Sequence, residues 1–252
     1  MTKLNYFLPF VFALLSLGVI EWYIGAPRMV YFALLIVIIF NLATAFILGK
    51  KERSDWWKFA LLPTLANLIV IGYSIILTNH VMLQVLAILL TIFNYIYWRY
   101  VFYYLHRQSQ YTSFSLENLS FYINFILVFL FGSLIYGLRS LLSLNILALG
   151  IAVLIILCLI VLQVFWISKL NWKENKIYII IGVLALMELF FMLSFLPLDH
   201  NLLGFLWATN YYVVISMISD KLKDRLTKQK IKYILVLTFV CWLILFLSAR
   251  WI

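Results

Sequence analysis

The segment LNILALGIAVLIILCLIVLQVFWI, residues 144–167, contains no charged residue. At the helical rise of 1.5 Å per residue, it is long enough to cross about 30 Å of hydrocarbon. It lacks the regular alternation of a β-barrel strand. In lipid, the backbone polar groups of a segment also have to be bonded within that segment. The stretch therefore predicts a transmembrane helix.

Runs of similar length and character fill most of the chain. Hydrophobic residues make up 66% of the sequence and charged residues 11%, which is about half the charged share of a soluble domain. We predict an all-α, polytopic integral membrane bundle of about nine transmembrane helices, forming a single domain over residues 1–252. The runs lie at about residues 5–24, 29–48, 59–77, 81–104, 118–138, 144–167, 177–197, 201–219 and 231–249.

The basic residues predict the orientation of the chain. Its net charge is +10, and alternate loops hold sixteen of the 19 Lys and Arg residues. The positive-inside bias then places the N-terminus in the cytoplasm and the C-terminus outside. We expect the basic residues to meet anionic lipid headgroups. No loop is long enough to form a soluble nucleic-acid-binding module, so no nucleic-acid partner is expected. The external basic residues are Arg28, Arg139 and Arg250.

A weak internal repeat is visible in the order of the polar residues. Matching positions are separated by 111 to 120 residues, which is four helices and so restores the same orientation. This predicts parallel repeat units at 1–110 and 111–220, followed by a ninth helix at 231–249, an arrangement found in transporters. The matching pairs include Arg28 and Arg139, Gly49-Lys50 and Ser168-Lys169, His80 and His200, and Asn94-Tyr95 and Asn210-Tyr211.

One acidic residue lies deep in a predicted helix. Glu188 is about twelve residues into the seventh run, and an ionisable residue at such a depth is a functional candidate. Asn210, Asn67 and Asn94 lie at comparable depth and are its expected hydrogen-bonding partners. These four residues predict a polar cleft on a substrate or ion pathway. The alternative is that the carboxyl is a satisfied core group and the asparagines join helices by hydrogen bonds.

Polar residues also gather at both interfaces. Tyr95, Arg99 and Tyr103 are spaced four apart, on a helical face that could hold a lipid phosphate, although an aromatic belt around a snorkelling arginine explains it equally well. The cytoplasmic polar set is Arg99, His106, Arg107 and Glu117. The external rim set is Glu21, Arg28, His80, Arg139, Asp199 and His200. Convergence of the external rim set would favour an enzyme acting on a lipid or polyprenyl substrate.

Several classes of protein are disfavoured by missing motifs. The chain has no HExxH or GxSxG motif, no Walker A loop, no pair of intramembrane aspartates and no TVGYG filter. Cys158 and Cys241 are isolated, and His80 and His200 have only Asp199 nearby in sequence. We therefore expect no metal and no cofactor.

The stretch YTSFSLENLSFYIN, Tyr111 to Asn124, together with the nine runs, resembles uncharacterised multi-pass membrane proteins of small-genome, candidate-phylum bacteria. The resemblance is best over the fourth and fifth runs. It implies a bacterial cytoplasmic (inner) membrane and brings no activity with it.

Three hypotheses for function remain open from the sequence. The leading one is a small carrier with a polar cleft around Glu188. The second is a membrane enzyme acting on a lipid or polyprenyl substrate at the external face. The third is a structural or assembly subunit that packs against other membrane helices. Membrane lipids are the expected partners, and a homo-oligomer or another membrane subunit is a further possible partner.

Overall fold

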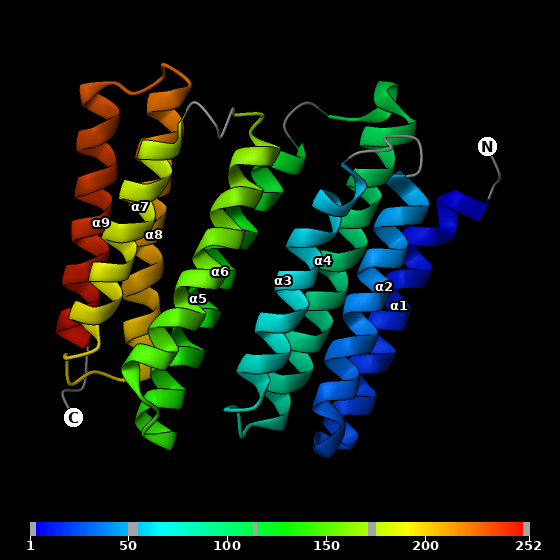
Figure 1. The fold of residues 1–252 in the computed structure, drawn as a ribbon, viewed down its shortest axis with the longest axis horizontal. Helices are drawn as coiled ribbons and strands as arrows, with labels where there is room; N and C mark the ends of the chain where they lie inside the picture. The colour runs from blue at the N-terminus through cyan, green and yellow to red at the C-terminus, as the bar shows by residue number, and fades with distance from the viewer. Residues whose placement is uncertain (1–3, 50–54, 113–114, 171–174, 249–252) are drawn as a thin grey trace. The chain divides into compact units, whose positions relative to one another are not determined.

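The computed structural model describes residues 4–49, 55–112, 115–170 and 175–248, and these form nine α-helices with short connections (Figure 1). Two 3-10 turns, Pro27–Met29 and Gln108–Gln110, lie between helices. The helices are α1 (Leu4–Gly25), α2 (Val30–Gly49), α3 (Trp56–Ser74), α4 (His80–His106), α5 (Ser115–Leu142), α6 (Ile146–Ile167), α7 (Lys176–Leu193), α8 (His200–Leu222) and α9 (Lys228–Ser248).

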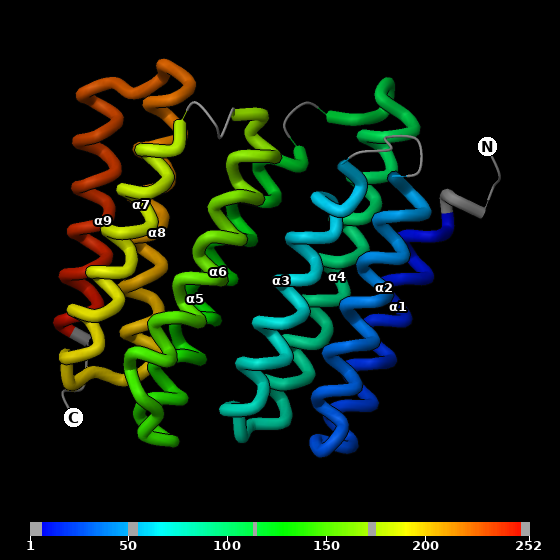
Figure 2. Tube along the Cα trace, in the orientation of Figure 1, coloured from blue at the N-terminus to red at the C-terminus, as the bar shows by residue number. Residues whose placement is uncertain are grey.

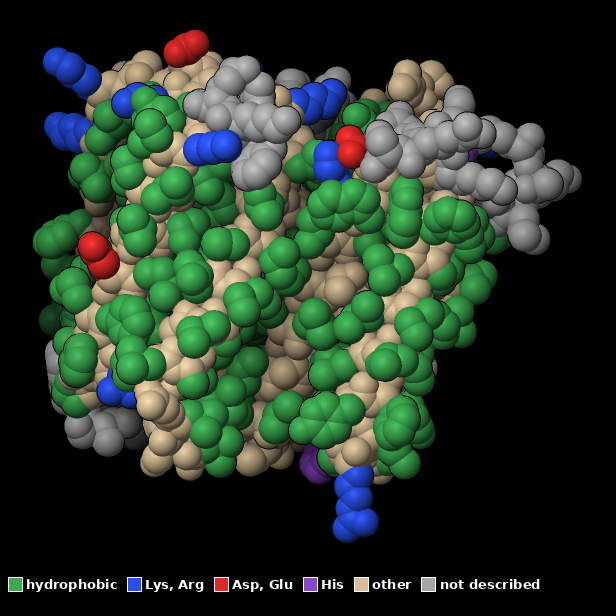
Figure 3. Space-filling model, viewed as in Figure 1, with side chains coloured by type: hydrophobic (Ala, Val, Ile, Leu, Met, Phe, Trp, Pro, Cys, Tyr) green, Lys and Arg blue, Asp and Glu red, His purple; other side chains and the backbone are tan. Residues whose placement is uncertain are grey.

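Each of these nine helices is long and apolar enough to cross a membrane. Hydrophobic side chains cover the length of the helices, while Lys and Arg side chains lie near helix ends (Figure 3). The described part of the chain is thus an all-helical, multi-pass membrane protein, which confirms the predicted fold class. The orientation relative to the cytoplasm stays a prediction.

Some helix ends differ from the predicted bounds. The run predicted at 177–197 ends as a helix at Leu193, because Ser194 begins a turn and Pro197 cannot continue a helix. The run predicted at 118–138 begins at Ser115 and continues to Leu142. Glu188 therefore lies about 8 Å, by the helical rise, from the end of α7 rather than near its middle.

Backbone contacts divide the chain into two compact units, residues 1–121 and 122–252. The single domain predicted from the sequence stays a prediction. In the first unit, α1 packs against α2 and α4, α2 packs against α3, and α3 packs against α4. The Cα trace shows these four helices side by side (Figure 2). Tyr97 and Trp98 of α4 are fully buried, and the Tyr97 hydroxyl donates a hydrogen bond to the Phe59 carbonyl of α3 at 2.9 Å.

In the second unit, α6 packs against α7, α7 against α8, and α8 against α9. Helices α5 and α8 approach closely at glycines. A Cβ added at Gly132 would lie 3.0 Å from the Gly204 Cα, and one added at Gly204 would lie 2.5 Å from the Ser133 backbone nitrogen. Small residues allow this approach, which gives van der Waals packing and brings backbones together in lipid.

Side-chain hydrogen bonds to backbone carbonyls fasten α7 to its neighbours. Trp207 of α8 donates to the Leu186 carbonyl at 3.0 Å, and Tyr136 of α5 donates to the Phe190 carbonyl at 3.1 Å. Helix α9 is more loosely attached: it packs on α8, where Trp242 donates to Thr209 Oγ1 at 3.1 Å, and most of its residues are exposed.

The two units have corresponding contacts at several positions paired by the predicted repeat. Asn79 caps the start of α4 by accepting from the Val81 amide, and Asp199 caps the start of α8 by accepting from the Asn201 amide. Helix α3 packs against α2 and α4 in the first unit, as α7 packs against α6 and α8 in the second. A common origin of the units stays a prediction, which these contacts agree with.

Candidate functional site

The last turns of α4 hold a guanidinium group between two tyrosine hydroxyls. Arg99 Nε donates to Tyr103 Oη at 3.1 Å, and Arg99 Nη1 donates to Tyr95 Oη at 3.1 Å. The guanidinium carbon also lies 5.8 Å from the Tyr95 ring centroid and 5.5 Å from that of Tyr103. The spacing of four residues puts all three side chains on one face of the helix.

The length of α4 explains the depth of this arginine. The helix has 27 residues, and about 20 suffice to cross the hydrocarbon. Arg99 is seven residues before the end of the helix at His106, so it lies roughly 10 Å from that end along the axis. Its side chain is exposed. Arg99 thus lies about two turns before the end of α4, on the side predicted to be cytoplasmic.

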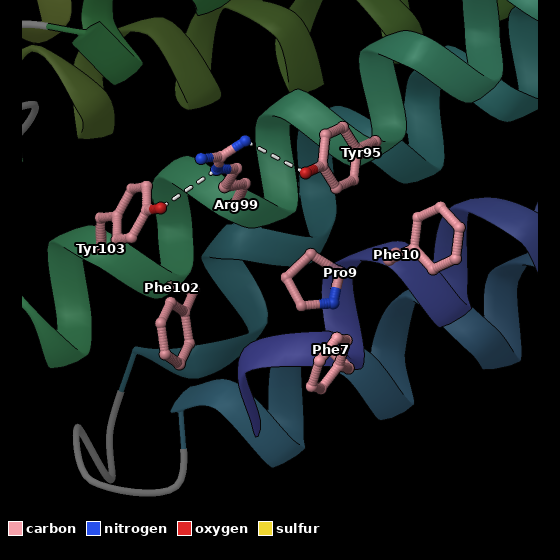
Figure 4. A pocket seen from close by; sticks show the side chains of 7 residues that line it. All are labelled: Phe7, Pro9, Phe10, Tyr95, Arg99, Phe102 and Tyr103. Atoms are coloured by element: carbon pink, nitrogen blue, oxygen red, sulfur yellow. Dashed lines mark hydrogen bonds between the residues drawn. The ribbon is translucent and has the colours of Figure 1, made fainter. Parts of the chain in front are cut away.

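A pocket with a volume of about 310 Å³ opens beside Arg99, between α4 and the beginning of α1 (Figure 4). The lining residues are Phe7, Pro9 and Phe10 from α1, and Tyr95, Arg99, Phe102 and Tyr103 from α4. Figure 4 shows Tyr95, Arg99 and Tyr103 along α4 on one side of the opening, and Phe7, Pro9 and Phe10 of α1 on the other. The volume is at the small end for a ligand pocket, which suits a headgroup or part of a chain.

Aromatic contact holds the two walls of this pocket together. The rings of Phe10 and Tyr95 meet edge to face, with centroids 6.3 Å apart. Phe7 is 60% exposed and Phe10 52% exposed, so much of the α1 wall remains available for apolar contact. Pro9 between them is buried.

Arg99 is the one charged residue that lines the pocket. Among the described residues, no carboxylate pairs with it, and its hydrogen bonds to Tyr95 and Tyr103 use two of the five guanidinium N–H groups. A guanidinium presents its donors in a fixed fork that matches phosphate and carboxylate oxygens. The arrangement can therefore receive an anionic group beside an apolar one.

Of the other residues in the predicted cytoplasmic set, two lie near the end of α4. His106 stacks on Phe102, with ring centroids 5.2 Å apart. Arg107 donates to Gln110 Oε1 at 3.3 Å. Glu117 lies in the first turn of α5. None of these three lines the pocket, so the set contributes only Arg99 to it.

Asn67 and Asn94 come together in the core of the first unit. Asn67 Nδ2 donates to Asn94 Oδ1 at 3.3 Å, and Asn94 Nδ2 donates to Asn67 Oδ1 at 3.4 Å. Asn94 Nδ2 also donates to Ser16 Oγ at 3.3 Å, and Asn67 Nδ2 to the Pro63 carbonyl at 2.6 Å. The three side chains link α1, α3 and α4 within the first unit.

Glu188 and Asn210 both belong to the second unit but do not bond to each other. Asn210 Nδ2 donates to the Leu206 carbonyl of its own helix at 2.8 Å. Glu188 is exposed on α7, and no hydrogen bond or ion pair joins it to another described residue. Within the second unit, the expected hydrogen bond between Glu188 and Asn210 is absent from the described contacts, because α7 packs on α8 through a different face. The expected pairing of Glu188 with Asn67 and Asn94 stays a prediction.

The external rim residues of the first unit remain separate in their contacts. Glu21 Oε2 accepts from Gln84 Nε2 at 3.2 Å. Arg28 and His80 are exposed, and neither shares a hydrogen bond or ion pair with Glu21 among the described residues.

Among the external rim residues of the second unit, Asp199 and His200 are in contact, while Arg139 bonds to a backbone carbonyl. Arg139 Nη1 donates to the Ser194 carbonyl just beyond α7 at 2.6 Å. Asp199 caps α8, and its Oδ1 lies 3.1 Å from Nδ1 of the neighbouring His200. No three His, Cys, Asp or Glu side chains within the described ranges are grouped so that they could hold a metal ion.

The α1 wall of the pocket was not predicted from the sequence. Phe7 and Phe10 are three residues apart at the start of the first helix, flanking Pro9, and this start lies on the same predicted side of the membrane as Arg99. This shared side was the one feature of the sequence that could have indicated a contact between Arg99 and the first helix. Nothing in the sequence paired the first helix with the fourth.

Comparison with known proteins gave no relationship from which to assign a function: no family model, curated protein or solved structure matches the chain.

Proposed function

We propose that this integral membrane protein binds an anionic amphiphile, such as a phospholipid or a polyprenyl phosphate, in the pocket beside Arg99. The phosphate oxygens accept hydrogen bonds from the guanidinium, and the apolar part of the ligand lies against Phe7, Phe10 and Phe102. The observation that carries the proposal is the guanidinium itself: Tyr95 and Tyr103 orient it, and no carboxylate of the described residues neutralises it.

The pocket combines one cationic side chain with an apolar lining, which favours an amphiphile over a small soluble anion. Six of the seven lining residues are aromatic or proline, and the seventh is Arg99 (Figure 4). A soluble anion would gain the guanidinium contact but none of the apolar contact with Phe7 and Phe10, which lipid chains can supply. Arg99 also lies about two turns before the end of α4, from where a long side chain can extend toward a headgroup phosphate.

The carrier predicted around Glu188 receives less support. That hypothesis needs a polar cleft in which a carboxyl changes its partners between two states. The asparagines expected to line the cleft make their hydrogen bonds elsewhere, in two cases to each other. We therefore propose lipid binding without assigning transport or catalysis to the pocket.

The experiment that tests the proposal is lipid binding to the purified full chain by native mass spectrometry and by fluorescence competition. Phosphatidylglycerol is compared with phosphatidylcholine, and inorganic phosphate is the competitor that separates headgroup recognition from binding of the free anion. A hydrogen bond to a charged group contributes about 1.5–3 kcal/mol, so Arg99→Gln should weaken phosphatidylglycerol binding by roughly 10- to 100-fold.

Arg107→Gln is the matched control, because it removes the same charge from the same end of α4 outside the pocket. It should change binding by less than threefold, an effect of roughly half a kcal/mol. Equal losses in the two variants would show that the lipid responds to overall charge and would refute the site. Displacement by millimolar inorganic phosphate would assign the pocket to a soluble anion instead.

A further inference from the structure

The hydroxyl groups of Tyr95 and Tyr103 have hydrogen-bonding capacity beyond their contacts with Arg99. Each hydroxyl oxygen accepts from the guanidinium at 3.1 Å, Tyr95 from Nη1 and Tyr103 from Nε. A phenolic hydroxyl that accepts in this way still has its own O–H to donate. Neither hydroxyl donates a hydrogen bond to another described residue. Both O–H groups are therefore available to a ligand in the pocket.

The guanidinium of Arg99 supplies further donors at the same place. Two of its five N–H groups bond to the tyrosines, so three remain, and both N–H groups of Nη2 are among them. The guanidinium lies between the two hydroxyls along one face of α4 (Figure 4). The α1 wall of the pocket is formed by Phe7, Pro9 and Phe10, whose side chains have no polar group. The pocket therefore offers up to five donors and no competing carboxylate from its lining residues.

This set of donors matches a phosphomonoester better than a phosphodiester. A phosphomonoester has three terminal oxygens that accept hydrogen bonds and a charge of about −1.5 to −2 at neutral pH. A phosphodiester has one terminal oxygen fewer and a single negative charge, so it would leave some of the donors without an acceptor. Hydrogen bonds to a charged acceptor are the stronger kind, which makes this difference relevant to affinity.

We propose that the pocket selects lipids with a terminal phosphomonoester, such as phosphatidic acid or a polyprenyl monophosphate, over phosphodiester lipids such as phosphatidylglycerol. This inference rests on the proposed function, because it takes the headgroup of the bound amphiphile to lie at Arg99. The guanidinium binds the phosphate through its remaining N–H groups. The hydroxyls of Tyr95 and Tyr103 donate to terminal oxygens on either side of it.

The rings of the two tyrosines have a role that is separate from their hydroxyls. The Tyr95 ring meets Phe10 edge to face, and the Arg99 guanidinium carbon lies 5.8 Å from the Tyr95 centroid and 5.5 Å from that of Tyr103. A change of both tyrosines to phenylalanine keeps these ring contacts and the charge of Arg99, and removes only the two hydroxyls. Selection of the headgroup can therefore be measured apart from folding and from overall charge.

The test is competition between phosphatidic acid and phosphatidylglycerol with identical acyl chains for the purified full chain, followed by native mass spectrometry at mildly alkaline pH. The wild type should bind phosphatidic acid more tightly by roughly tenfold or more, since it makes a further hydrogen bond to a charged group. The double change Tyr95→Phe with Tyr103→Phe should lower this ratio to less than about threefold. Tyr100→Phe removes a hydroxyl from the same helix outside the pocket and should keep the wild-type ratio.

The outcomes separate this inference from the proposed function. Equal affinity of the wild type for the two lipids would overturn the inference and leave the binding of an anionic amphiphile intact. Equal losses for both lipids in the double variant would also overturn it, because the hydroxyls would then only orient Arg99. Binding of neither lipid above the level of phosphatidylcholine would refute both. Displacement of phosphatidic acid by millimolar glycerol 3-phosphate, which has the same headgroup without acyl chains, would overturn the lipid as the ligand.

Discussion

The side-chain amides of Asn67 and Asn94 exchange hydrogen bonds across the interface of α3 and α4, at 3.3 and 3.4 Å between donor nitrogen and acceptor oxygen. Both residues are almost fully buried. In a reciprocal pair of this kind, the side-chain oxygen of each residue has its donor only while the other residue is present. The two residues therefore act as one structural element of the first unit.

The loss in free energy of unfolding on removing one amide should be more than half of the loss on removing both. Asn94→Leu leaves the Asn67 carbonyl oxygen without its donor, and we expect a loss of about 1–2 kcal/mol in the free energy of unfolding. The double change Asn67→Leu with Asn94→Leu removes both groups and should cost less than the sum of the single changes. Denaturant titration in detergent measures this cycle, and strictly additive losses would contradict the coupling.

The tyrosines beside Arg99 should affect ligand affinity rather than folding. Tyr95→Phe and Tyr103→Phe each remove one hydroxyl that orients the guanidinium while keeping the ring. We expect each change to weaken phosphatidylglycerol binding by about threefold to tenfold, since a hydrogen bond contributes about 0.5–1.5 kcal/mol. The melting temperature should stay unchanged. Unaltered affinity in both variants would mean that the hydroxyls do not orient Arg99 for its ligand.

The close approach of α5 and α8 should make Gly204 intolerant of any side chain. Gly204→Ala would place a Cβ 2.5 Å from the Ser133 nitrogen and 2.9 Å from the Phe129 oxygen, so the helices would have to separate. We expect a loss of roughly 1–3 kcal/mol in stability. Gly18→Ala is the matched control, because a Cβ there meets nothing within 4 Å and alanine favours the helix. Similar thermal stability of the two variants would refute the packing argument.

Arg139 should stabilise the connection between α7 and α8. Its guanidinium donates to the Ser194 carbonyl and lies 5.8 Å from the Phe195 ring centroid. Arg139→Met should cost about 1–2 kcal/mol and speed hydrogen exchange in residues 194–198. Arg28→Met changes the residue paired with it in the predicted repeat, which is exposed, and should leave stability within about 0.5 kcal/mol. Equal losses of stability in Arg139→Met and Arg28→Met would show that the hydrogen bond of Arg139 to Ser194 does not stabilise the connection.

The nine helices were predictable because hydrocarbon leaves a 20-residue apolar run few alternatives to a helix. The ends were less predictable, because local capping and turn formation decide them. Asn79 accepts from the Val81 amide and starts α4, while the turn at Ser194 ends α7 earlier than its hydropathy indicates.

The candidate site was only partly predictable. The spacing of Tyr95, Arg99 and Tyr103 placed them on one face, but the contact of α1 with α4 joins segments about eighty residues apart and depends on packing. The environment of Glu188 was hidden for a different reason. Helix α7 is apolar on almost every side, so its sequence does not indicate which side packs against the unit.

Helix α9 makes few contacts, but its presence changes the side of the membrane on which the last helix is predicted to end. Eight crossings would return the chain to the side on which it began, whereas the predicted ninth crossing, by α9, places Ser248 on the side opposite to the start of α1. A helix that contributes little to packing thus decides which compartment a reporter fused to the last residues would sample. Fusions after α8 and after α9 should accordingly give opposite signals with an enzyme that is active in one compartment alone.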